Sequence, residues 1–287
     1  MSTNSATRRT LLKTGAAFGI LSSATKIGLI GEAKAAEGRL KQSVCKWCYR
    51  DMSLDELAEH SAKMGIVAID LLTEEEWPTL EKYGLKCSVG SGICSIADGL
   101  NLAENHKEIE SNFRRLLPAA KKHGVPNLIC FSGNRRNVSD EEAWETCALL
   151  LNKVKAQAED LGVTIIMELL NSKVNHPDYQ CDKTLWGVEL MKRVDSERVK
   201  LLYDIYHMQI MEGDVIRTIR DYGQYLAHYH TGGNPGRNEI DETQELNYPA
   251  ISRAIADLGF DGYFAHEFIP KRDPVTSLKQ AVELCTV

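Results

Sequence analysis

The chain has 287 residues, of which 43% are hydrophobic and 26% are charged, as in an ordinary globular protein. Its formal net charge of −6 argues against a nucleic-acid-binding protein, because such proteins usually carry a basic face. We therefore expect a small-molecule substrate and no nucleic-acid partner.

The first 36 residues differ in character from the rest of the chain. Arg8 and Arg9 precede two leucines and a lysine, a mildly apolar stretch follows over residues 14–30, and Ala33-Lys34-Ala35 has the form of a cleavage site. These features are typical of a twin-arginine export signal, so we expect an exported, periplasmic protein. A membrane anchor is the weaker interpretation, because Lys26 interrupts a stretch already short for a span of ~20 residues. We expect signal and linker over residues 1–36, one folded domain over residues 37–287, and no stable membrane span.

All eight cysteines lie beyond this segment, and only Cys45 and Cys48 have a suggestive spacing. A redox or zinc-binding C-x-x-C motif would need a helix start or a second pair of ligands, and the sequence offers neither. Both residues lie in or beside the first expected strand, where small buried side chains are common. We expect structural thiols.

The remainder of the chain alternates short runs rich in apolar and β-branched residues with longer amphipathic segments. In chain order, the expected strands cover residues 42–47, 66–71, 85–90, 127–131, 163–169, 199–204, 225–231 and 262–268. The expected helices cover residues 53–64, 74–83, 104–123, 140–161, 183–194, 214–222, 248–258 and 276–285. Ser53 with Glu56, and Ser139 with Glu142, have the spacing of a capping box at a helix start.

Eight strand–helix units in strict alternation predict a single-domain α/β fold, the (β/α)8 or TIM barrel. An open, doubly wound sheet has less support. No G-x-G-x-x-G motif follows the first expected strand, and no phosphate-binding G-x-x-x-x-G-K-[ST] motif occurs anywhere.

In such barrels the active site lies at the C-terminal ends of the strands. The fifth, sixth and eighth expected strands reach Glu168, Asp204 and Glu267, and the seventh carries His228 and His230. Each acid could simply cap the next helix, but burying three neighbouring carboxylates without a cation is costly. These strand ends therefore predict a site for a divalent cation such as Mn²⁺, Mg²⁺ or Co²⁺. His230 is favoured over His228 because it lies nearer the strand end.

Two further side chains lie close to these strand ends. His207 follows Asp204 within reach of a substrate hydroxyl, and Arg237 ends the turn Asn234-Pro235-Gly236-Arg237. An arginine there could bind a carboxylate, a phosphate or a pair of hydroxyls. Each residue also has a structural interpretation, His207 as a helix-start residue on the barrel rim and Arg237 as a solvated loop residue.

Several segments resemble the hydroxypyruvate isomerase branch of the xylose isomerase-like barrels. They are Glu168-Leu169-Leu170-Asn171, Tyr203-Asp204-Ile205-Tyr206-His207-Met208-Gln209, His230 with Pro235-Gly236-Arg237, Leu246-Asn247-Tyr248 and His266-Glu267-Phe268. The resemblance implies metal ligands at four positions: Glu168, Asp204, His230 and Glu267. It further implies that Glu168 and Glu267 act as the acid–base pair and that His207 and Arg237 contact the substrate.

Two departures from that branch leave the substrate open. Hydroxypyruvate isomerases often carry Gln at the position of His230, where related ketose 3-epimerases carry His. They also have a Gly-rich stretch after the Pro-Gly-Arg turn, where this chain has the largely polar residues 238–245.

The implied reaction moves a proton next to the carbonyl of a small sugar or keto acid through an enediolate, as an isomerase or an epimerase does. A dehydratase or lyase acting on a keto-sugar or keto-cyclitol shares this chemistry. A metal-dependent endonuclease would need more His and acidic ligands and a basic groove, and a non-catalytic sugar-binding protein would have an incomplete ligand set. The oligomeric state stays open, with a homo-oligomer among the alternatives.

Overall fold

The computed structural model describes residues 38–287, so the expected export signal over residues 1–36 lies outside the described residues. No helix within residues 38–287 combines the length and the apolar character that crossing a bilayer requires.

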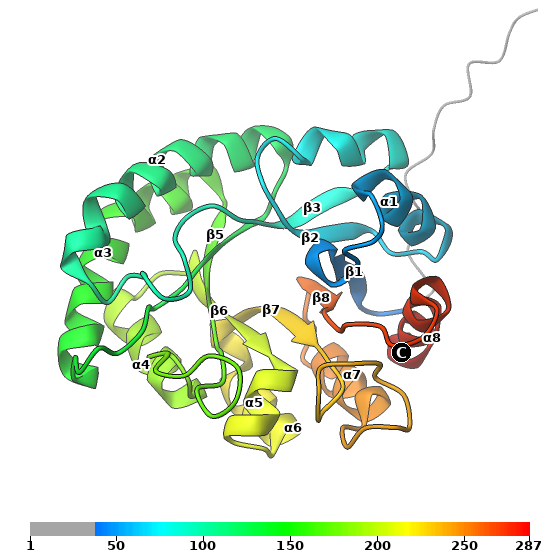
Figure 1. Ribbon diagram of the computed structural model, residues 1–287. Coiled ribbons are helices and arrows are strands. Elements are labelled where there is room, and N and C mark those ends of the chain that lie inside the picture. Colours follow the sequence, from blue (N-terminus) through cyan, green and yellow to red (C-terminus); the bar gives the residue numbers. More distant parts are fainter. Residues whose placement is uncertain (1–37) are drawn as a thin grey trace, which may run out of the picture.

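Eight strands form one closed barrel, in which each strand pairs in parallel with the next and β8 pairs with β1. Their bounds are β1 Lys41–Cys45, β2 Ala68–Leu72, β3 Lys86–Gly90, β4 Asn127–Cys130, β5 Thr164–Glu168, β6 Val199–Asp204, β7 Leu226–Thr231 and β8 Tyr263–His266. Figure 1 shows these strands in the middle of the molecule with the helices around them. The predicted (β/α)8 barrel is confirmed.

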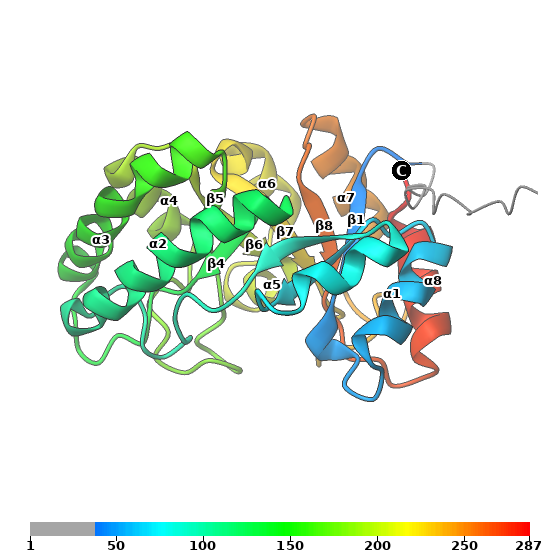
Figure 2. The same ribbon diagram turned by 90° about the horizontal axis from the view of Figure 1, so that it is seen from above.

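The helices cover the outside of this barrel. They are α1 Leu54–Lys63, α2 His106–His123, α3 Asp140–Leu161, α4 Thr184–Val194, α5 Ile205–Met211, α6 Val215–Tyr222, α7 Tyr248–Asp257 and α8 Pro274–Cys285, with short 3-10 helices η1 Lys46–Cys48, η2 Trp77–Tyr83, η3 Ala103–Asn105 and η4 Gly223–Tyr225. Figures 1 and 2 both show α3 and α4 on the side of the barrel opposite α1 and α8.

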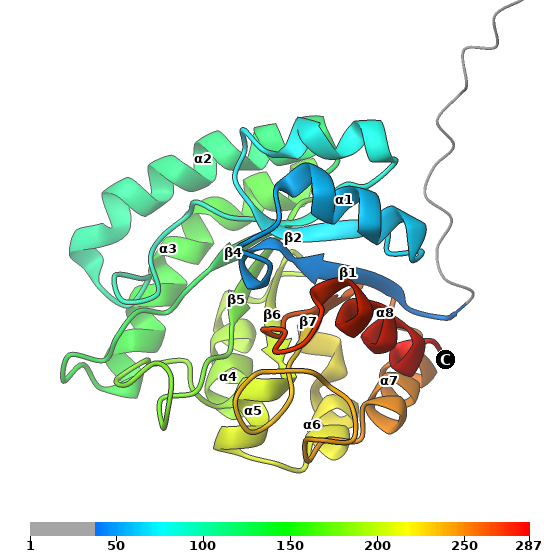
Figure 3. The same ribbon diagram turned by 45° about the vertical axis from the view of Figure 1, so that its right-hand side comes forward.

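The two ends of the described chain meet at one place on the barrel. Figures 1 and 3 show α8 next to β1. The amide of Arg39 donates to the carbonyl of Val287 at 2.8 Å, and Gln42 in β1 donates from Nε2 to the carbonyl of Val282 in α8 at 3.2 Å. The last helix thereby covers the seam between the first and last strands.

The predicted helix starts at Ser53 and Ser139 are confirmed. Each hydroxyl accepts from the amide three residues on, and the Glu side chain at that position accepts from the serine amide, as a capping box requires. Helix α3 ends at Gly162, whose φ of 69° is a left-handed conformation that glycine adopts without strain.

Among the elements that differ from the prediction are one expected helix and one that was not expected. The expected helix over residues 74–83 is the 3-10 helix η2, which begins only at Trp77 and has Pro78, a residue without an amide hydrogen, in its first turn. Helix α5 was not predicted. It begins directly after Asp204, whose carboxylate accepts from the amide of His207 at 2.9 Å.

On the β3–β6 side, an apolar cluster fills the barrel interior below its mouth. Val89, Ile129, Ile166 and Leu202, from β3 to β6, are each at most 2% exposed. Ile166 and Leu202 precede Glu168 and Asp204 by two residues, so strand alternation turns all four side chains to the same face. This layer supports the strand ends above it.

We expect Ile166→Ala to lower the free energy of unfolding by about 2–5 kcal/mol, because the lost side chain leaves a cavity in a closed interior. Urea unfolding followed by circular dichroism measures this change. Leu149→Ala, on the outer face of α3 where the side chain is 56% exposed, should stay within about 0.5 kcal/mol of the unaltered protein. Equal losses in the two variants would contradict this description of the interior.

Candidate active site

Side chains from four consecutive strands converge at the mouth of the barrel. Glu168, Asp204, His230 and Glu267 each offer one ligand atom, and these atoms all lie within 4.8 Å of one another. Each of the four residues is at most 5% exposed. The strands are parallel, so their C-terminal ends share one rim and bring together residues separated by up to about 100 positions in the chain.

The imidazole of His230 lies among the three carboxylates. Its Nδ1 is 2.6 Å from Oε2 of Glu267, 3.2 Å from Oε1 of Glu168 and 3.9 Å from Oδ2 of Asp204. His228 lies deeper in the barrel and is not in this group. The preference for His230 over His228 therefore agrees with the geometry.

Asp204 serves both the helix that follows it and the site. One oxygen accepts from the amide of His207 at the start of α5, and the other accepts from Nη2 of Arg237 at 2.6 Å. Burial raises the pKa of Asp204 to about 8, although the charge of Arg237 acts in the opposite direction. Asp204 therefore caps helix α5 and also belongs to the site, although the sequence left these two roles as alternatives.

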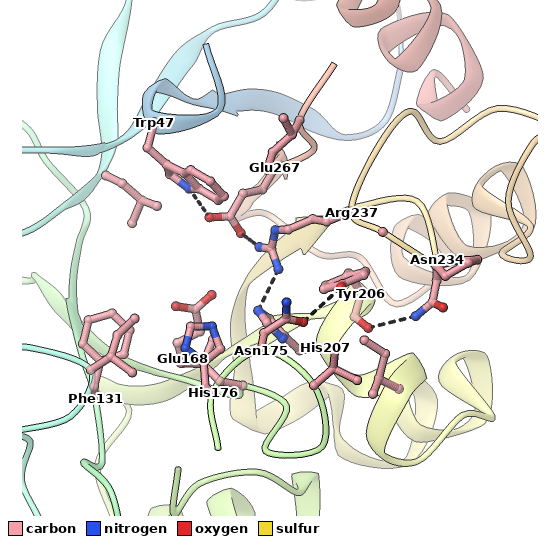
Figure 4. A pocket seen from close by; sticks show the side chains of 18 of the residues that line it. Trp47, Phe131, Glu168, Asn175, His176, Tyr206, His207, Asn234, Arg237 and Glu267 are labelled. Atoms are coloured by element: carbon pink, nitrogen blue, oxygen red, sulfur yellow. Dashed lines mark hydrogen bonds and ion pairs between the residues drawn. The ribbon is translucent and has the colours of Figure 1, made fainter. Parts of the chain in front are cut away.

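Arg237 is buried, being only 8% exposed, so its interpretation as a solvated loop residue is wrong. The turn that carries it has φ values of 96° at Gly236 and 57° at Arg237, and this left-handed backbone folds the side chain back over the strand ends. Its guanidinium donates to Asp204 and Glu267 and lies 4.9 Å from the centre of the Tyr206 ring. Figure 4 shows Arg237 reaching between Glu267 and His207.

His207 lies in the first turn of α5 and is 2% exposed. Its Nε2 accepts from Nη1 of Arg237 at 2.7 Å, and its Nδ1 lies 3.1 Å from the amide nitrogen of Asn171. Burial and the charge of Arg237 hold the pKa of His207 well below its usual range. The ring is therefore neutral, and it lines the cavity described below.

The two glutamates have different surroundings. Burial raises the pKa of Glu168. Burial acts in the same direction on Glu267, but the charges of Arg237 and His230 outweigh it and hold the pKa of Glu267 well below its usual range. Two carboxylates held in different environments can take different parts in a proton transfer.

Two residues of the site were not predicted from the sequence. Trp47, in η1 directly after β1, donates from Nε1 to Oε1 of Glu267 at 2.5 Å. Asp70, in β2, is fully buried and has Oδ2 2.5 Å from Nε2 of His228 and 3.4 Å from Nε2 of His230, while Ser88 donates to its other oxygen. A carboxylate within an apolar strand is a sequence signal of a functional residue. Only the folded chain, however, brings Asp70 to these histidines.

A cavity of about 810 Å³ is lined by two of the four converging residues, Glu168 and Glu267. Figure 4 shows Glu267 and Trp47 on one side of it, Phe131 on another, and Arg237, Tyr206 and Asn234 across from Phe131. The polar lining on the β5–β7 side comprises Asn175, His176, Tyr206, His207, Asn234 and Arg237. The cavity is large enough for a small organic substrate.

The donor set fits a divalent cation. Three buried carboxylates with one imidazole nitrogen are ligands that Mn²⁺, Mg²⁺ and Co²⁺ accept. Cys45, Asp70 and His230 form a second close group that shares His230, and Cys45 Sγ lies 3.8 Å from Nε2 of His230, the nitrogen turned away from the three carboxylates. All eight cysteines are free and seven are buried, with Cys94 partly so.

The family model described as xylose isomerase-like TIM barrel matches residues 53–286. The chain belongs to this family. The resemblance noted from the strand-end motifs is thereby confirmed, and it covers the first half of the barrel as well as the second.

Curated relatives include proteins named as isomerases and epimerases. The chain is 30% identical to a Xenopus laevis protein named as a hydroxypyruvate isomerase, over 51% of this chain and 53% of that protein. It is 33% identical to a D-psicose 3-epimerase of Ruminiclostridium cellulolyticum, over 44% of this chain and 42% of the other. The matches thus span about half the length of these curated relatives.

Among solved structures, the barrel is similar to a Brucella melitensis protein described as AP endonuclease, family 2. The TM-score is 0.75 at 22% identity, and the match covers 83% of this chain and 97% of the other. At that identity the likeness shows the shared xylose isomerase-like barrel fold and does not extend to the activity.

Proposed function

We propose that this protein is a divalent-metal-dependent isomerase or epimerase that moves a proton next to the carbonyl of a small sugar or keto acid. The observation that carries the proposal is the convergence of Glu168, Asp204, His230 and Glu267 within 4.8 Å, with Glu168 and Glu267 lining the cavity. Relatives named for isomerisation of hydroxypyruvate and epimerisation of psicose support the reaction class.

Glu168, Asp204, His230 and Glu267 would hold the cation. When bound, it supplies positive charge that stabilises the enediolate formed as the proton leaves. The same charge offsets the cost of burying three carboxylates.

In the proposed reaction, one glutamate carboxylate takes the proton from the carbon next to the carbonyl. The other glutamate returns a proton. Its return to the adjacent carbon, with the hydroxyl proton passing to the former carbonyl oxygen, isomerises the substrate, and its return to the opposite face of the same carbon epimerises it. Figure 4 shows Glu168 and Glu267 entering the cavity from different sides, as two-sided proton transfer requires. His207 and Arg237 line the cavity beside them and would bind substrate oxygens.

Solvent-deuterium incorporation tests this proposal. Purified protein loaded with Mn²⁺ or Co²⁺ is incubated in D₂O with a panel of small ketoses and keto acids, and the products are followed by NMR. Label on the carbon beside the carbonyl, together with interconversion of isomers, is the expected result. Loss of water would instead identify a dehydratase or lyase, and no exchange with any compound would contradict the proposal.

We also propose that the protein acts in the periplasm after twin-arginine export, on the grounds of the paired arginines and the apolar stretch behind them. Replacing both arginines, Arg8→Lys with Arg9→Lys, should retain the protein in the cytoplasm of a bacterial host that has this pathway. Cell fractionation with immunoblotting measures the distribution. The control is Lys26→Arg, which keeps the charge pattern and should be exported, whereas export of the double variant would refute this route.

A further inference from the structure

Two segments form the wall of the cavity that carries Arg237 and Glu267. The first follows β7 and includes Arg237, and the second follows β8 and begins with Glu267. The amide of Ile269 donates to the carbonyl of Arg237 at 2.7 Å, and Nδ2 of Asn238 donates to the carbonyl of Ile269 at 2.9 Å. Residues 31 positions apart in the chain are thus hydrogen-bonded to each other beside the site.

Glu239 joins the same two segments at a buried point. It is only 6% exposed, and its Oε1 accepts from the amides of Lys271 and Arg272 at 2.9 and 3.0 Å and from the hydroxyl of Ser277 at 3.0 Å. The guanidinium of Arg272 also donates to Asp241, two residues after Glu239. A single carboxylate therefore holds the first turn of α8 and the segment before it against the segment after β7.

The charge of Glu239 strengthens this link. Burial raises the pKa of the carboxyl, but the hydrogen bond from the amide of Arg272 and those from its other donors outweigh burial and hold the pKa below its usual range. The side chain is therefore ionised at neutral pH, and hydrogen bonds to an ionised acceptor are about twice as strong as those between neutral groups. A neutral side chain of the same size would hold the two segments less firmly.

We propose that Glu239 is a positioning residue, which keeps Arg237 against Glu267 by fixing the segment after β7 to the segment after β8. It lies two residues beyond Arg237, and the amides that it binds lie four and five residues beyond Glu267. Arg237 in turn donates to Glu267 and Asp204. The inference rests on the proposed function, in which Arg237 binds a substrate oxygen and Glu267 belongs to the acid–base pair.

The backbone at Arg237 needs such support. Arg237 lies in neither a helix nor a strand, and its φ of 57° is a left-handed conformation that residues with a side chain rarely adopt. Such a conformation persists only where surrounding contacts hold it. The amide of Arg237 donates to the carbonyl of Gly233 within the turn at 2.7 Å, and the link through Glu239 holds the turn from outside. Loosening of that link would let Arg237 move, and misplacement of a substrate-binding group by ~1 Å can lower the rate by about 10²-fold.

Glu239→Gln removes the charge and keeps nearly the size of the side chain. In the Mn²⁺-loaded protein, we expect this change to lower kcat/KM for deuterium exchange by about 10–100-fold. Asp273→Asn is the matched control. Within residues 38–287, the Asp273 side chain accepts only from the amide and hydroxyl of Thr276, so this variant weakens the same end of α8 without touching the link. It should keep kcat/KM close to that of the unaltered protein, and a similar loss in both variants would overturn the inference.

A double-mutant cycle determines whether Glu239 acts through Arg237. In protein that already carries Arg237→Ala, Glu239→Gln should cause little further loss, because the side chain that Glu239 positions is absent. A merely structural residue would lower kcat/KM by the same factor in both backgrounds. Equal factors would therefore exclude the positioning role.

Chemical modification of Arg237 by phenylglyoxal reports the position of this side chain without any assay of activity. Peptide mass spectrometry should find Arg237 modified about tenfold faster in Glu239→Gln than in the unaltered protein, because the buried guanidinium becomes accessible. The exposed Arg50 gives the reference rate in each protein, and Asp273→Asn should leave the rate at Arg237 unchanged. Ser277→Ala, which removes one of the three donors and keeps the carboxylate, should give a smaller change in the same direction.

The two proposals fail separately. Faster modification of Arg237 in Glu239→Gln, together with no exchange of any compound by the unaltered protein, would support the link and contradict the proposed reaction. An unchanged rate in Glu239→Gln, or in Ser277→Ala where the first variant does not fold, would overturn the positioning of Arg237 and leave the proposed reaction intact.

Discussion

Glu168→Gln and Glu267→Gln are each expected to lower kcat/KM by at least ~10²–10⁴-fold while leaving the protein folded. Glutamine has nearly the shape of glutamate but can neither take up the substrate proton nor balance the charge of a cation. Both side chains lie at the cavity floor with an oxygen within 3.2 Å of Nδ1 of His230. The measurement is deuterium exchange on the best substrate, with circular dichroism to confirm folding.

Glu212→Gln is a matched control. Glu212 is also hydrogen-bonded, through both oxygens to Thr184, but it is exposed and does not line the cavity. This variant should retain activity close to that of the unaltered protein. Normal turnover in either site variant would refute the assignment of the acid–base pair, whereas loss of activity in Glu212→Gln as well would point to a general effect of replacing a hydrogen-bonded carboxylate.

The candidate site was predictable wherever it depends on topology alone. Once the alternation of strands and helices indicates a barrel, every residue at the C-terminal end of a strand is assigned to the same rim. Glu168, Asp204 and Glu267 follow from this rule without any knowledge of side-chain contacts. His230 follows from the alternation of side chains along β7 together with its position near the strand end.

What the sequence did not predict depends on contacts between distant segments. Asp70 lies within an apolar strand and meets His228, 158 positions further on. Trp47 was expected to continue β1, but the chain turns into η1 there and its indole reaches Glu267, 220 positions away. No local pattern encodes either pairing.

Arg237 and helix α5 are a second case, in which a short segment takes its structure from the site. The sequence named Arg237 as a candidate substrate contact but did not predict its burial. Arg237 lies in a polar turn, and only the left-handed backbone at Gly236 and Arg237 brings it inside. Helix α5 spans seven residues, too few for a clear helical period, and its start depends on the carboxylate of Asp204. Both features are consequences of the strand ends that the sequence did identify.

Removal of the metal should abolish activity and lower thermal stability together. At a Mn²⁺ concentration one hundred times the dissociation constant, binding to the folded state contributes about 2.7 kcal/mol, which corresponds to a rise in Tm of about 5–10 °C for a domain of this size. Dialysis against a chelator, followed by readdition of Mn²⁺, is the treatment, and differential scanning calorimetry with the exchange assay is the measurement. Activity and Tm are expected to recover together.

His230→Ala determines whether that stabilisation comes from the predicted site. Without the imidazole, Mn²⁺ should no longer raise Tm, because only the three carboxylates remain to hold it and the cation loses its most central ligand. His60→Ala, on helix α1 away from the barrel mouth, should keep the full rise. A full Mn²⁺-dependent rise in His230→Ala would mean that the cation binds elsewhere, and full activity in the chelated protein would mean that the proton transfer does not depend on it.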